Sequence, residues 1–400
     1  MSKRLIGGSA DMSERFAAVA RYSKKIRASE YILSNACNIR CEGCWFFDGG
    51  HDTATKEVKD LGMIREFIAQ EVSRGVNTAL LIGGEPTLFP LRIAEYVAQM
   101  ERVTISTNGL KPFPVAGFEN VAVAVTLFGG GPTDDKLRAI RPNGTRFTGL
   151  FETALRNYRA DPRAHFIYAI NEAGIDHMEE TVDRIAQNGN GVTFNFYSAY
   201  GTDDPLRISS QPRLLEAAHR VAEKYPDVCT SPKVYIDAMI TGKTLWGEFG
   251  YDVCPSISVD HPIHKDRLAN GNPALDKFNA WAPDLKTTQF CCTSGKCDGC
   301  RDSQAVYSWL LKSAARFAKS DLGIEGWVEL AEAYWSQFVW SPYYKAKRQA
   351  TSPERRYVQI TPASAHKKRQ GQVLGRKTRW ALGIACLGRC CTKKNAPEGA

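Results

Sequence analysis

The sequence predicts an α/β protein in which parallel strands alternate with helices. Between about residues 30 and 200, short runs rich in β-branched and aromatic residues alternate with stretches of helical period. The runs are almost continuously apolar, as strands are when helices cover a parallel sheet. Six such βα units make either an open doubly wound sheet or a partial barrel. In both folds the loops that follow the strands carry the chemistry.

The individual elements follow from the apolar pattern. The expected strands lie at residues 30–34, 79–83, 102–107, 121–128, 165–171 and 191–197. The expected helices lie at residues 60–75, 91–100, 150–159 and 177–189. The last helical pattern ends in Asn188-Gly189, which is a typical helix C-cap. The link between the third and fourth strands contains Pro112 and Pro114, so we expect no full helix there.

Composition and charge narrow the class of protein. The chain is 43% hydrophobic and 24% charged, which is ordinary for a globular protein. It shows no signal peptide and no apolar run of the ~18–20 residues that a membrane helix needs, so we expect a cytoplasmic protein. Residues 341–400 carry 14 Lys and Arg against 2 Glu, a net charge of +12. Because the whole chain has a net charge of +9, residues 1–340 have a net charge of −3. A solvated basic tail is the commoner outcome of such a charge run, and we do not expect nucleic-acid binding.

We divide the chain into four parts. Residues 1–29 form a lead-in, residues 30–204 the α/β core, residues 205–345 a cysteine-rich extension, and residues 346–400 a basic, poorly ordered tail. Eight prolines fall between residues 200 and 300. We therefore expect few long elements in that stretch, followed by a helical segment over residues 302–340.

Three of the twelve cysteines, Cys37, Cys41 and Cys44, directly follow the first expected strand. In a reducing compartment, clustered cysteines are more often metal ligands than disulfides. A 4Fe–4S cluster usually takes four cysteines, and three leave one iron open to a small molecule. A zinc site completed from elsewhere and unliganded thiols are the alternatives. Cys229 stands alone, and we expect a buried thiol without a metal.

The cysteine motif does not stand alone. "CNIRCEGC" (37–44) resembles the Cys-x3-Cys-x2-Cys signature of the radical S-adenosylmethionine (radical SAM) superfamily. The second strand runs into Gly83-Gly84-Glu85-Pro86, which looks like the GGEP motif of that family. The third strand ends in "STNG" (106–109), similar to its strand-end Thr-Asn-Gly. The resemblance covers residues ~30–200 and implies a partial (β/α)6 parallel barrel of radical SAM type, followed by the cysteine-rich extension and the helical and basic tail.

The resemblance also implies roles for particular residues. Cys37, Cys41 and Cys44 would bind a 4Fe–4S cluster, and no catalytic residue beyond the cluster can be assigned. The turn of Gly83, Gly84, Glu85 and Pro86 would bind the methionine amine of S-adenosylmethionine, with Glu85 as an ion-pair partner. The remaining expected cofactor contacts are Thr107 and Asn108 with methionine or ribose, Thr126 with the methionine carboxylate, Asn171 with ribose, and Phe194 or Phe196 with adenine.

The implied reaction is reductive cleavage of S-adenosylmethionine to a 5′-deoxyadenosyl radical, which abstracts hydrogen from a substrate. A flavodoxin or ferredoxin would supply the electron. Two departures from the family pattern matter. Gly43 stands where the family usually has an aromatic residue, so either Trp45 would supply the adenine surface or adenine would be held less tightly. Phe128 in "TLFGGG" replaces an acid found in peptide-modifying relatives. We expect a small-molecule biosynthetic substrate; a peptide substrate, and a non-catalytic metal protein with a nucleic-acid-binding tail, are the alternatives.

A second cysteine group lies in the extension. Cys254, Cys292, Cys297 and Cys300 would form a four-ligand set, with Cys291 as an alternative ligand. The group resembles the cysteine knots that hold auxiliary clusters in many radical SAM enzymes. We expect an auxiliary 4Fe–4S cluster there, while a structural zinc ion and no metal remain open. The tail group of Cys386, Cys390 and Cys391 is expected to be incidental or redox-labile.

Overall fold

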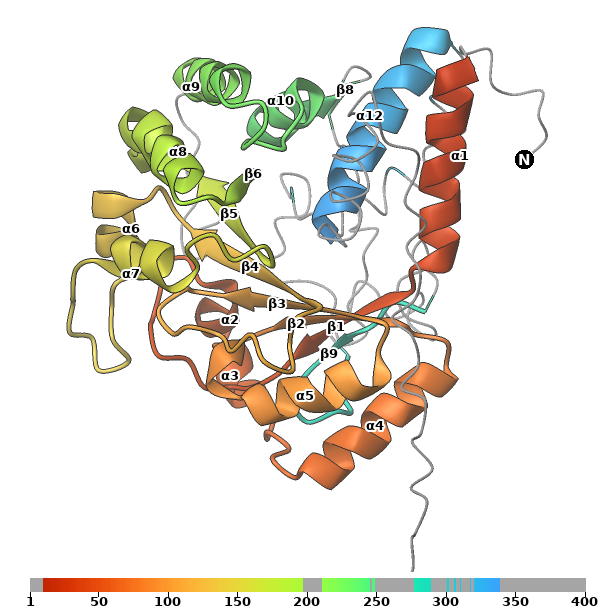
Figure 1. The fold of residues 1–400 in the computed structure, drawn as a ribbon, viewed down its shortest axis with the longest axis vertical. Coiled ribbons are helices and arrows are strands. Elements are labelled where there is room, and N and C mark those ends of the chain that lie inside the picture. The colour runs from red at the N-terminus through yellow and green to blue at the C-terminus, as the bar shows by residue number, and fades with distance from the viewer. Residues whose placement is uncertain are drawn as a thin grey trace, which may run out of the picture. The chain divides into compact units, whose positions relative to one another are not determined.

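The structure is a computed structural model, and it describes residues 10–196, 211–244, 247–248, 277–288, 320–338 and the single residues 301, 306, 310 and 317 (Figure 1). The basic tail, residues 346–400, lies outside the described residues. Among the helices that are described, none is both long and apolar enough to cross a membrane.

A parallel sheet forms the centre of the described fold. Its strands are β1 (Ala28–Ile32), β2 (Thr78–Ile82), β3 (Arg102–Thr107), β4 (Val121–Leu127), β5 (Ala164–Ile170), β6 (Gly191–Phe196) and β9 (Ala280–Trp281). The order across the sheet is β6-β5-β4-β3-β2-β1-β9, and every pair is parallel. The sheet is open, because β6 and β9 end it without pairing to each other. The predicted α/β class with six parallel strands in chain order is confirmed.

The predicted boundaries are close to the observed ones. The strand at Arg102–Thr107 matches its prediction residue for residue, and the others shift by one or two residues. The short strand β9 was not predicted, because two residues carry no detectable alternation. A separate antiparallel pair, β7 (Lys243–Thr244) with β8 (Gly247–Glu248), was not predicted either.

Helices follow the strands as the pattern predicted. They are α4 (Leu61–Ser73), α5 (Pro90–Gln99), α7 (Leu150–Asn157) and α8 (Met178–Gln187), with the short helices α2 (Trp45–Asp48), α3 (His51–Ala54), α6 (Gly131–Leu137), η1 (Pro86–Leu88) and η2 (Glu172–His177) between them. Local chemistry starts the helices: the Asp60 side chain accepts from the Met63 amide at the start of α4. Pro90 occupies the first turn of α5, where its missing N–H costs nothing.

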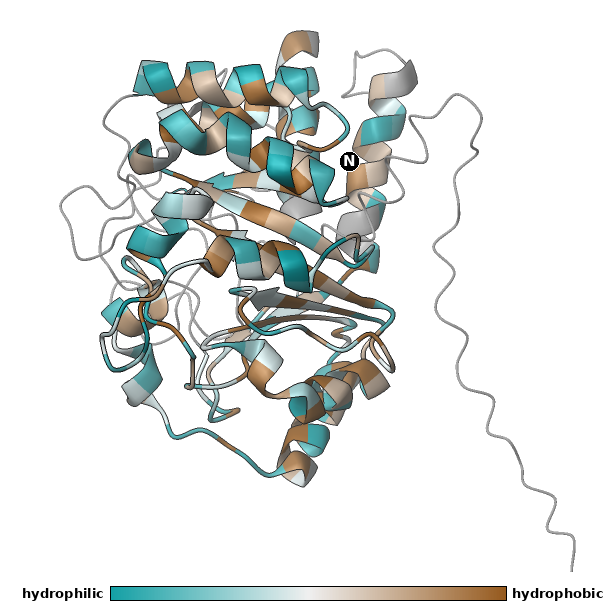
Figure 2. Ribbon diagram, turned by 60° about the vertical axis from the view of Figure 1, so that its left-hand side comes forward, coloured by the Kyte–Doolittle hydropathy of each residue, from teal (hydrophilic) through white to brown (hydrophobic). Residues whose placement is uncertain are grey.

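The two faces of the sheet carry different side chains. Val123, Val125 and Tyr168 belong to the large core that includes residues of the helices. From the other face, Ala122, Ala124 and Ile167 form a separate small cluster. Figure 2 shows the hydrophobic colour along the strands and both colours on the helices around them. Large apolar side chains are thus concentrated on the helix-covered face, as expected when amphipathic helices pack on a sheet.

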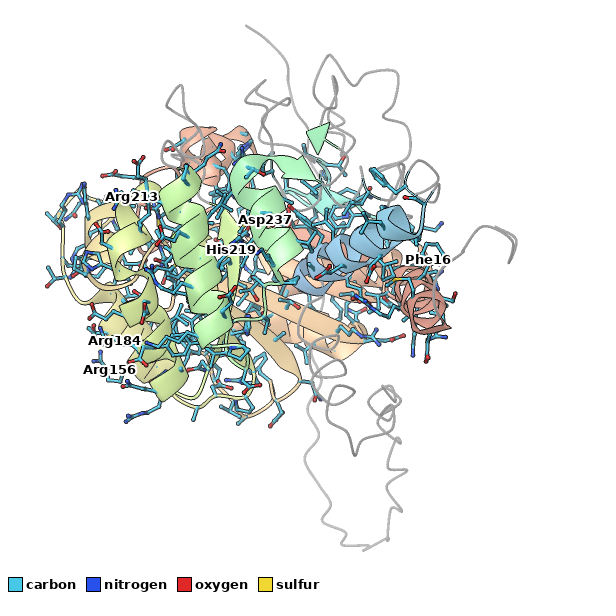
Figure 3. All side chains as sticks on the ribbon, turned by 90° about the horizontal axis from the view of Figure 1, so that it is seen from above. Phe16, Arg156, Arg184, Arg213, His219 and Asp237 are labelled. Carbon is cyan, nitrogen blue, oxygen red and sulfur yellow. The ribbon has the colours of Figure 1, made fainter. Side chains whose placement is uncertain are left out.

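The expectation of few long elements between residues 200 and 300 was wrong for its first part. Helices α9 (Gln211–Lys224) and α10 (Lys233–Thr241) occupy this stretch and pack on each other. Pro212 lies in the first turn of α9, and Pro232 is the N-cap of α10. These prolines mark helix beginnings, where proline is tolerated, and do not prevent helices. His219 Nε2 of α9 lies 2.7 Å from Asp237 Oδ1 of α10 (Figure 3).

The lead-in contains a helix that packs against the far end of the described chain. Helix α1 (Ala10–Lys25) lies beside α12 (Asp321–Phe338) (Figure 1). Arg15 and Glu332 form an ion pair of 2.8 Å between the two helices. The rings of Phe16 and Trp327 lie 5.6 Å apart. These contacts join the lead-in to the helical segment predicted after residue 302.

Candidate functional site

The cysteine loop, which we define as residues 34–44, begins directly after β1. The Arg40 amide donates to the Ile140 carbonyl at 2.7 Å, and the Glu42 amide donates to the Leu137 carbonyl at 2.8 Å. Ile39, which is 1% exposed, packs in a small cluster that includes Cys37 and Cys41. These contacts hold the three half-buried cysteines at the carboxyl end of the sheet, where the sequence predicted the chemistry.

The environment of the three thiols does not activate them as nucleophiles. Burial raises the pKa of the Cys37 thiol to about 12 and that of Cys44 to about 11, and it also raises the pKa of Cys41. A nucleophilic cysteine needs a lowered pKa. The isolated Cys229 is also a buried free thiol, as predicted, and is 5% exposed.

Three cysteines with one open position form a donor set that an iron–sulfur cluster could use. In the described part of the chain, no three His, Cys, Asp or Glu side chains are placed to hold one metal ion. Cysteine ligands of zinc must all lie about 2.3 Å from the same ion. In a 4Fe–4S cluster each cysteine binds its own iron, so the sulfurs stay further apart. The zinc alternative for Cys37, Cys41 and Cys44 therefore stays open beside the cluster.

The glycine turn after β2 lies directly against the cysteine loop. The Glu85 amide donates to the Ala36 carbonyl at 2.9 Å. Gly84 has a positive φ of 49°, and a Cβ atom there would lie 2.1 Å from the same Ala36 oxygen. Only glycine permits this approach at this backbone conformation. The turn and the loop are therefore fitted to each other at the level of the backbone.

Glu85 holds the turn after β2 to the turn after β3. Its carboxylate accepts from the Thr87 amide at 3.0 Å and the Thr87 hydroxyl at 2.6 Å, from the Thr107 hydroxyl at 2.7 Å and from the Asn108 amide at 2.8 Å. Glu85 is 1% exposed and Thr107 is 2% exposed. Glu85 therefore accepts hydrogen bonds only from groups inside the protein in this geometry. The buried side chains of Glu85 and Thr107 hold the two turns together beneath the surface of the site.

Asn108 joins the turn after β3 to the cysteine loop. Its side-chain nitrogen donates to Asn38 Oδ1 at 2.7 Å and lies 3.9 Å from Cys37 Sγ. Its side-chain oxygen accepts from the Leu110 amide at 2.9 Å. The three sequence motifs, found at the ends of three different strands, are thus brought together in space.

The residues expected on the later strands differ in accessibility. Thr126 is half-buried, and its hydroxyl lies 3.4 Å from that of Ser106. Asn171 is 1% exposed, and its amide group bonds to the carbonyls of Phe128 and Ala169 and to the Gly174 amide. Phe194 is 0% exposed and packs edge-on to a core tyrosine, which removes it from reach of an adenine. The side chain of Phe196 lies outside the described part.

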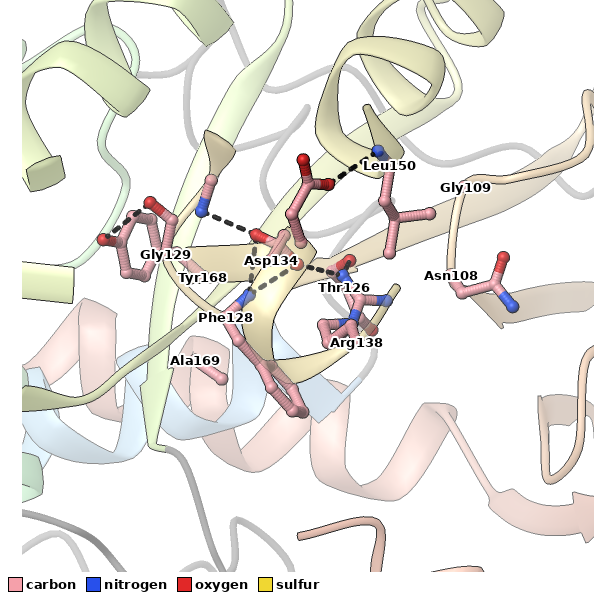
Figure 4. A network of polar contacts seen from close by, with 12 residues as sticks. Asn108, Gly109, Thr126, Phe128, Gly129, Asp134, Arg138, Leu150, Tyr168 and Ala169 are labelled. Carbon is pink, nitrogen blue, oxygen red and sulfur yellow. Dashed lines mark hydrogen bonds and ion pairs between the residues drawn. The ribbon is translucent and has the colours of Figure 1, made fainter. Parts of the chain in front are cut away.

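A buried ion pair after β4 was not predicted. Asp134 is 0% exposed and accepts from the amides of Phe128 and Gly130. It also pairs with Arg138 at 2.7 Å, and Arg138 donates to the Thr126 carbonyl (Figure 4). The signal was present, because an acid and a base four residues apart face each other on a helix.

A second buried ion pair supports the start of the cysteine loop. Glu57 and Arg92 lie 2.5 Å apart, and Glu57 accepts from the Asn35 amide at 2.8 Å and the Ser34 hydroxyl at 2.9 Å. Arg92 also donates to the Leu33 carbonyl at 2.9 Å. Sequence patterns gave no sign of this contact, because the two residues come from segments far apart in the chain.

A half-open cavity of about 470 Å³ lies between α6, α7 and α8 and shares no residue with the three motifs. Two of its three lining acids, Asp135 and Glu152, already have partners. Glu152 pairs with Arg184, and Asp135 accepts from the amides of Gly149 and Leu150. We assign it no role in the site.

The second cysteine group falls outside the described residues, so its metal stays a prediction. The same holds for the tail group. These cysteines are Cys254, Cys291, Cys292, Cys297, Cys300, Cys386, Cys390 and Cys391.

Comparison with known proteins adds independent observations. Residues 31–146 match the family model of the radical SAM superfamily. Over 135 residues the chain is 26% identical to GTP 3′,8-cyclase of Alkaliphilus oremlandii (strain OhILAs). This match takes in 31% of the present chain and 41% of the cyclase, so the chain matches less than half of its relative's length.

Solved structures are similar only at low sequence identity. The structure described as "Native anSMEcpe with bound AdoMet" has a TM-score of 0.39 and 14% identity, over 55% of this chain and 68% of that one. A methylornithine synthase has a TM-score of 0.31 and 16% identity, over 54% of this chain and 70% of that one.

The family match and the cyclase relative, together with the three converging motifs, define the chain as an enzyme. Residues 31–146 are the part of the chain that is similar to the radical SAM superfamily. That family implies a 4Fe–4S cluster, S-adenosylmethionine and a reductant. These comparisons give no support to the alternative of a non-catalytic metal protein.

Proposed function

We propose that this enzyme cleaves S-adenosylmethionine reductively at a 4Fe–4S cluster bound by Cys37, Cys41 and Cys44. A bound cluster would supply one electron, taken from a flavodoxin- or ferredoxin-type donor, for cleavage of the sulfonium carbon–sulfur bond. The products would be methionine and a 5′-deoxyadenosyl radical, which would become 5′-deoxyadenosine by taking a hydrogen atom from the substrate. One observation carries the proposal: the turns after β2 and β3 are bonded to the cysteine loop and to each other.

We assign the methionine amine to the backbone of the turn from Gly83 to Pro86. The buried carboxylate of Glu85 accepts from four donors, which favours a role in holding that backbone over direct pairing with the amine. Asn108 and Thr107 position the neighbouring turn in the same way. Preorganised backbone groups of this kind bind without paying for reorganisation when the ligand arrives.

We assign the methionine carboxylate to Thr126, because its hydroxyl is half-buried and lies on the face that carries Ser106. The internal bonds of Asn171 favour a capping role at the start of η2 over the ribose contact. Trp45 is half-buried and packs 5.1 Å from the His51 ring, which supports it as the apolar surface beside adenine where Gly43 supplies none.

A small organic molecule is the substrate class that we propose, with a peptide as the alternative. The segment 126–131 lacks the acid of peptide-modifying relatives, which supports this choice. The relative named GTP 3′,8-cyclase makes GTP a reasonable first probe. The match covers 41% of that protein. It therefore informs the cofactor-binding part of the proposal and leaves the identity of the substrate open. For the second cysteine group we propose an auxiliary 4Fe–4S cluster, on spacing alone.

The test is anaerobic reconstitution of the full chain with iron and sulfide, followed by dithionite and S-adenosylmethionine and an assay for 5′-deoxyadenosine. A Cys37→Ala/Cys41→Ala/Cys44→Ala variant is compared with Cys229→Ala, which removes a buried thiol outside the motifs. We expect deoxyadenosine from wild type and Cys229→Ala only, and a loss of about four irons in the triple variant.

About four irons left in the triple variant would support the auxiliary cluster. Wild-type protein that holds zinc and refuses iron would contradict the proposal, as would equal iron in the wild type and the triple variant. Because some enzymes of this kind need substrate bound before cleavage, the assay is repeated with GTP and with a pool of small metabolites.

A further inference from the structure

A basic segment lies against the cysteine loop. We call residues 136–148 the basic strap; it forms the end of α6 and the loop that leads to α7 (Figure 1). It contains no acid and four basic residues, Lys136, Arg138, Arg141 and Arg146. Arg138 is buried and paired with Asp134, whereas the other three are exposed. Because residues 1–340 have a net negative charge, the strap is a local concentration of positive charge.

The strap is bonded to the cysteine loop. The amides of Arg40 and Glu42 donate to carbonyls of the strap at 2.7 Å and 2.8 Å. The Arg146 side chain pairs with the Glu42 carboxylate at 3.0 Å. Phe147 of the strap packs in the same small apolar cluster as Cys41. The exposed charges of the strap are therefore carried on backbone that contacts the loop of the three cysteines.

The tip of the strap is a closed hairpin. Ile140 and Arg146 form an antiparallel bridge. The Arg141 amide donates to the Thr145 carbonyl at 2.8 Å, and the Gly144 amide donates to the Arg141 carbonyl at 2.8 Å. A surface that is already held in one shape loses less conformational entropy when a partner binds.

Two of the exposed cations are available to a partner. Within the described part of the chain, Lys136 and Arg141 form no ion pair. The guanidinium carbon of Arg141 lies 5.0 Å from the centroid of the Phe147 ring, which orients this side chain. The acid of the cysteine loop, Glu42, is already engaged by Arg146. The surface of the strap thus presents positive charge beside a half-buried aromatic ring, and arginine and aromatic residues are enriched in protein interfaces.

We propose that the basic strap is the docking surface for an acidic electron-transfer protein of the flavodoxin or ferredoxin class. The proposal rests on the proposed function, in which such a donor gives up one electron and a cluster on the cysteine loop takes it. Electron transfer between proteins slows steeply with distance, so the donor has to dock beside that loop. A positive surface steers an acidic partner to this place and speeds association. Redox complexes bury little area, so a surface as small as the strap is sufficient.

The test compares two reductants on the reconstituted full chain. One is an acidic flavodoxin in its reduced form, and the other is dithionite, which is small and needs no docking surface. Reduction of the cluster is followed by electron paramagnetic resonance on rapidly frozen samples. The signal that disappears in the Cys37→Ala/Cys41→Ala/Cys44→Ala variant identifies the cluster in question. The variants of the strap are Lys136→Glu/Arg141→Glu and the neutral pair Lys136→Gln/Arg141→Gln.

The matched control is Arg156→Glu/Arg159→Glu, which changes the net charge about as much as the charge reversal in the strap. Both arginines are exposed and lie at the end of α7 (Figure 3 labels Arg156). The chain continues from them into β5, so they lie where the strands begin and the cysteine loop lies where β1 ends.

At low salt we expect Lys136→Glu/Arg141→Glu to slow reduction by flavodoxin about tenfold, because charge steering changes association rates by factors of about 10 to 1,000. The neutral pair should slow it less. Reduction by dithionite should change far less than reduction by flavodoxin. Added salt should narrow the difference between the variants, since the Debye length falls from about 10 Å at 0.1 M salt to about 3 Å at 1 M. The control on α7 should keep the wild-type rate with both reductants.

An unchanged rate with flavodoxin in Lys136→Glu/Arg141→Glu would overturn the inference, as would an equal loss in the control on α7. An equal loss with both reductants would also overturn it, because the strap would then act on the cluster and not on the partner. If dithionite reduces the wild type but neither flavodoxin nor an acidic ferredoxin does, the inference fails and the proposed function stands. A wild-type protein without an iron–sulfur signal would overturn the proposed function and this inference together.

Discussion

The turn after β2 and the turn after β4 are both built from consecutive glycines around one buried carboxylate, but the two carboxylates have different partners. Glu85 accepts from neutral donors on two turns, with Thr87 and Thr107 supplying hydroxyls. Asp134 accepts from backbone amides and pairs with a cation, Arg138. Glu85 therefore leaves its negative charge in the site, whereas Asp134 has a compensating charge beside it.

The difference separates two tasks at one edge of the sheet. A carboxylate that collects several N–H and O–H donors fixes backbone geometry, because charge-assisted bonds are short and strong. The turn after β2 is thus suited to present its backbone. The turn after β4 instead contains a buried ion pair, Asp134 with Arg138. Glycine substitutions in the turn after β2 should therefore mainly affect binding at the site, and substitutions in the turn after β4 should mainly affect stability.

Gly84→Ala should have the largest effect. The added Cβ would lie 2.1 Å from the Ala36 oxygen and 2.7 Å from the Ser34 oxygen, and both belong to the cysteine-loop backbone. The loop has to move, so we expect loss of cluster iron after reconstitution and loss of deoxyadenosine formation. Iron counting on the full chain, with circular dichroism to follow the fold, measures this.

Gly117→Ala is the matched control for Gly84→Ala. Gly117 also has a positive φ, 83°, but nothing lies within 4 Å of its added Cβ. The left-handed conformation alone costs a non-glycine residue about 1–2 kcal/mol. We expect Gly117→Ala to lower the free energy of unfolding by that amount and to keep its iron. Equal iron in the two variants would show that the turn does not need the close approach.

Asp134→Asn should be the most destabilising change that leaves the glycine turn after β2 intact. It leaves the buried cation Arg138 uncompensated, and breaking a buried pair from one side typically costs about 3–5 kcal/mol. Urea unfolding of the full chain measures the loss. The neighbouring Asp135 accepts from two amides at the start of α7 and forms no ion pair within the described part of the chain, so Asp135→Asn should cost only about 1 kcal/mol. Equal losses would show that the charge of Arg138 is not at stake.

The sequence was sufficient to locate the strands and the motifs of the candidate site, because both depend on local patterns. Apolar runs predicted the strands, and the cysteine spacing and the glycine turn each lie within a few residues of a strand end. The ion pair of Glu57 with Arg92 was not predictable, because it joins distant segments and depends on side-chain conformation. The inward orientation of Glu85 was missed for the same reason: Glu85 looked available for a ligand until its partners Thr107 and Asn108 were located.

Glu85→Gln should have the smallest effect of the three, and it tests whether this carboxylate organises the site. The amide keeps one oxygen for Thr87 and Thr107, but its NH2 group would face the Asn108 amide, which is also a donor. An unmet buried hydrogen bond costs about 1–3 kcal/mol, so we expect a loss of about 2 kcal/mol in the free energy of unfolding. The exposed Glu66 on α4 provides the control Glu66→Gln, expected to stay within about 0.5 kcal/mol of wild type. If Glu85→Gln unfolds as wild type does but binds S-adenosylmethionine far more weakly, the carboxylate acts on the ligand directly and the assignment of Glu85 as an internal acceptor is wrong.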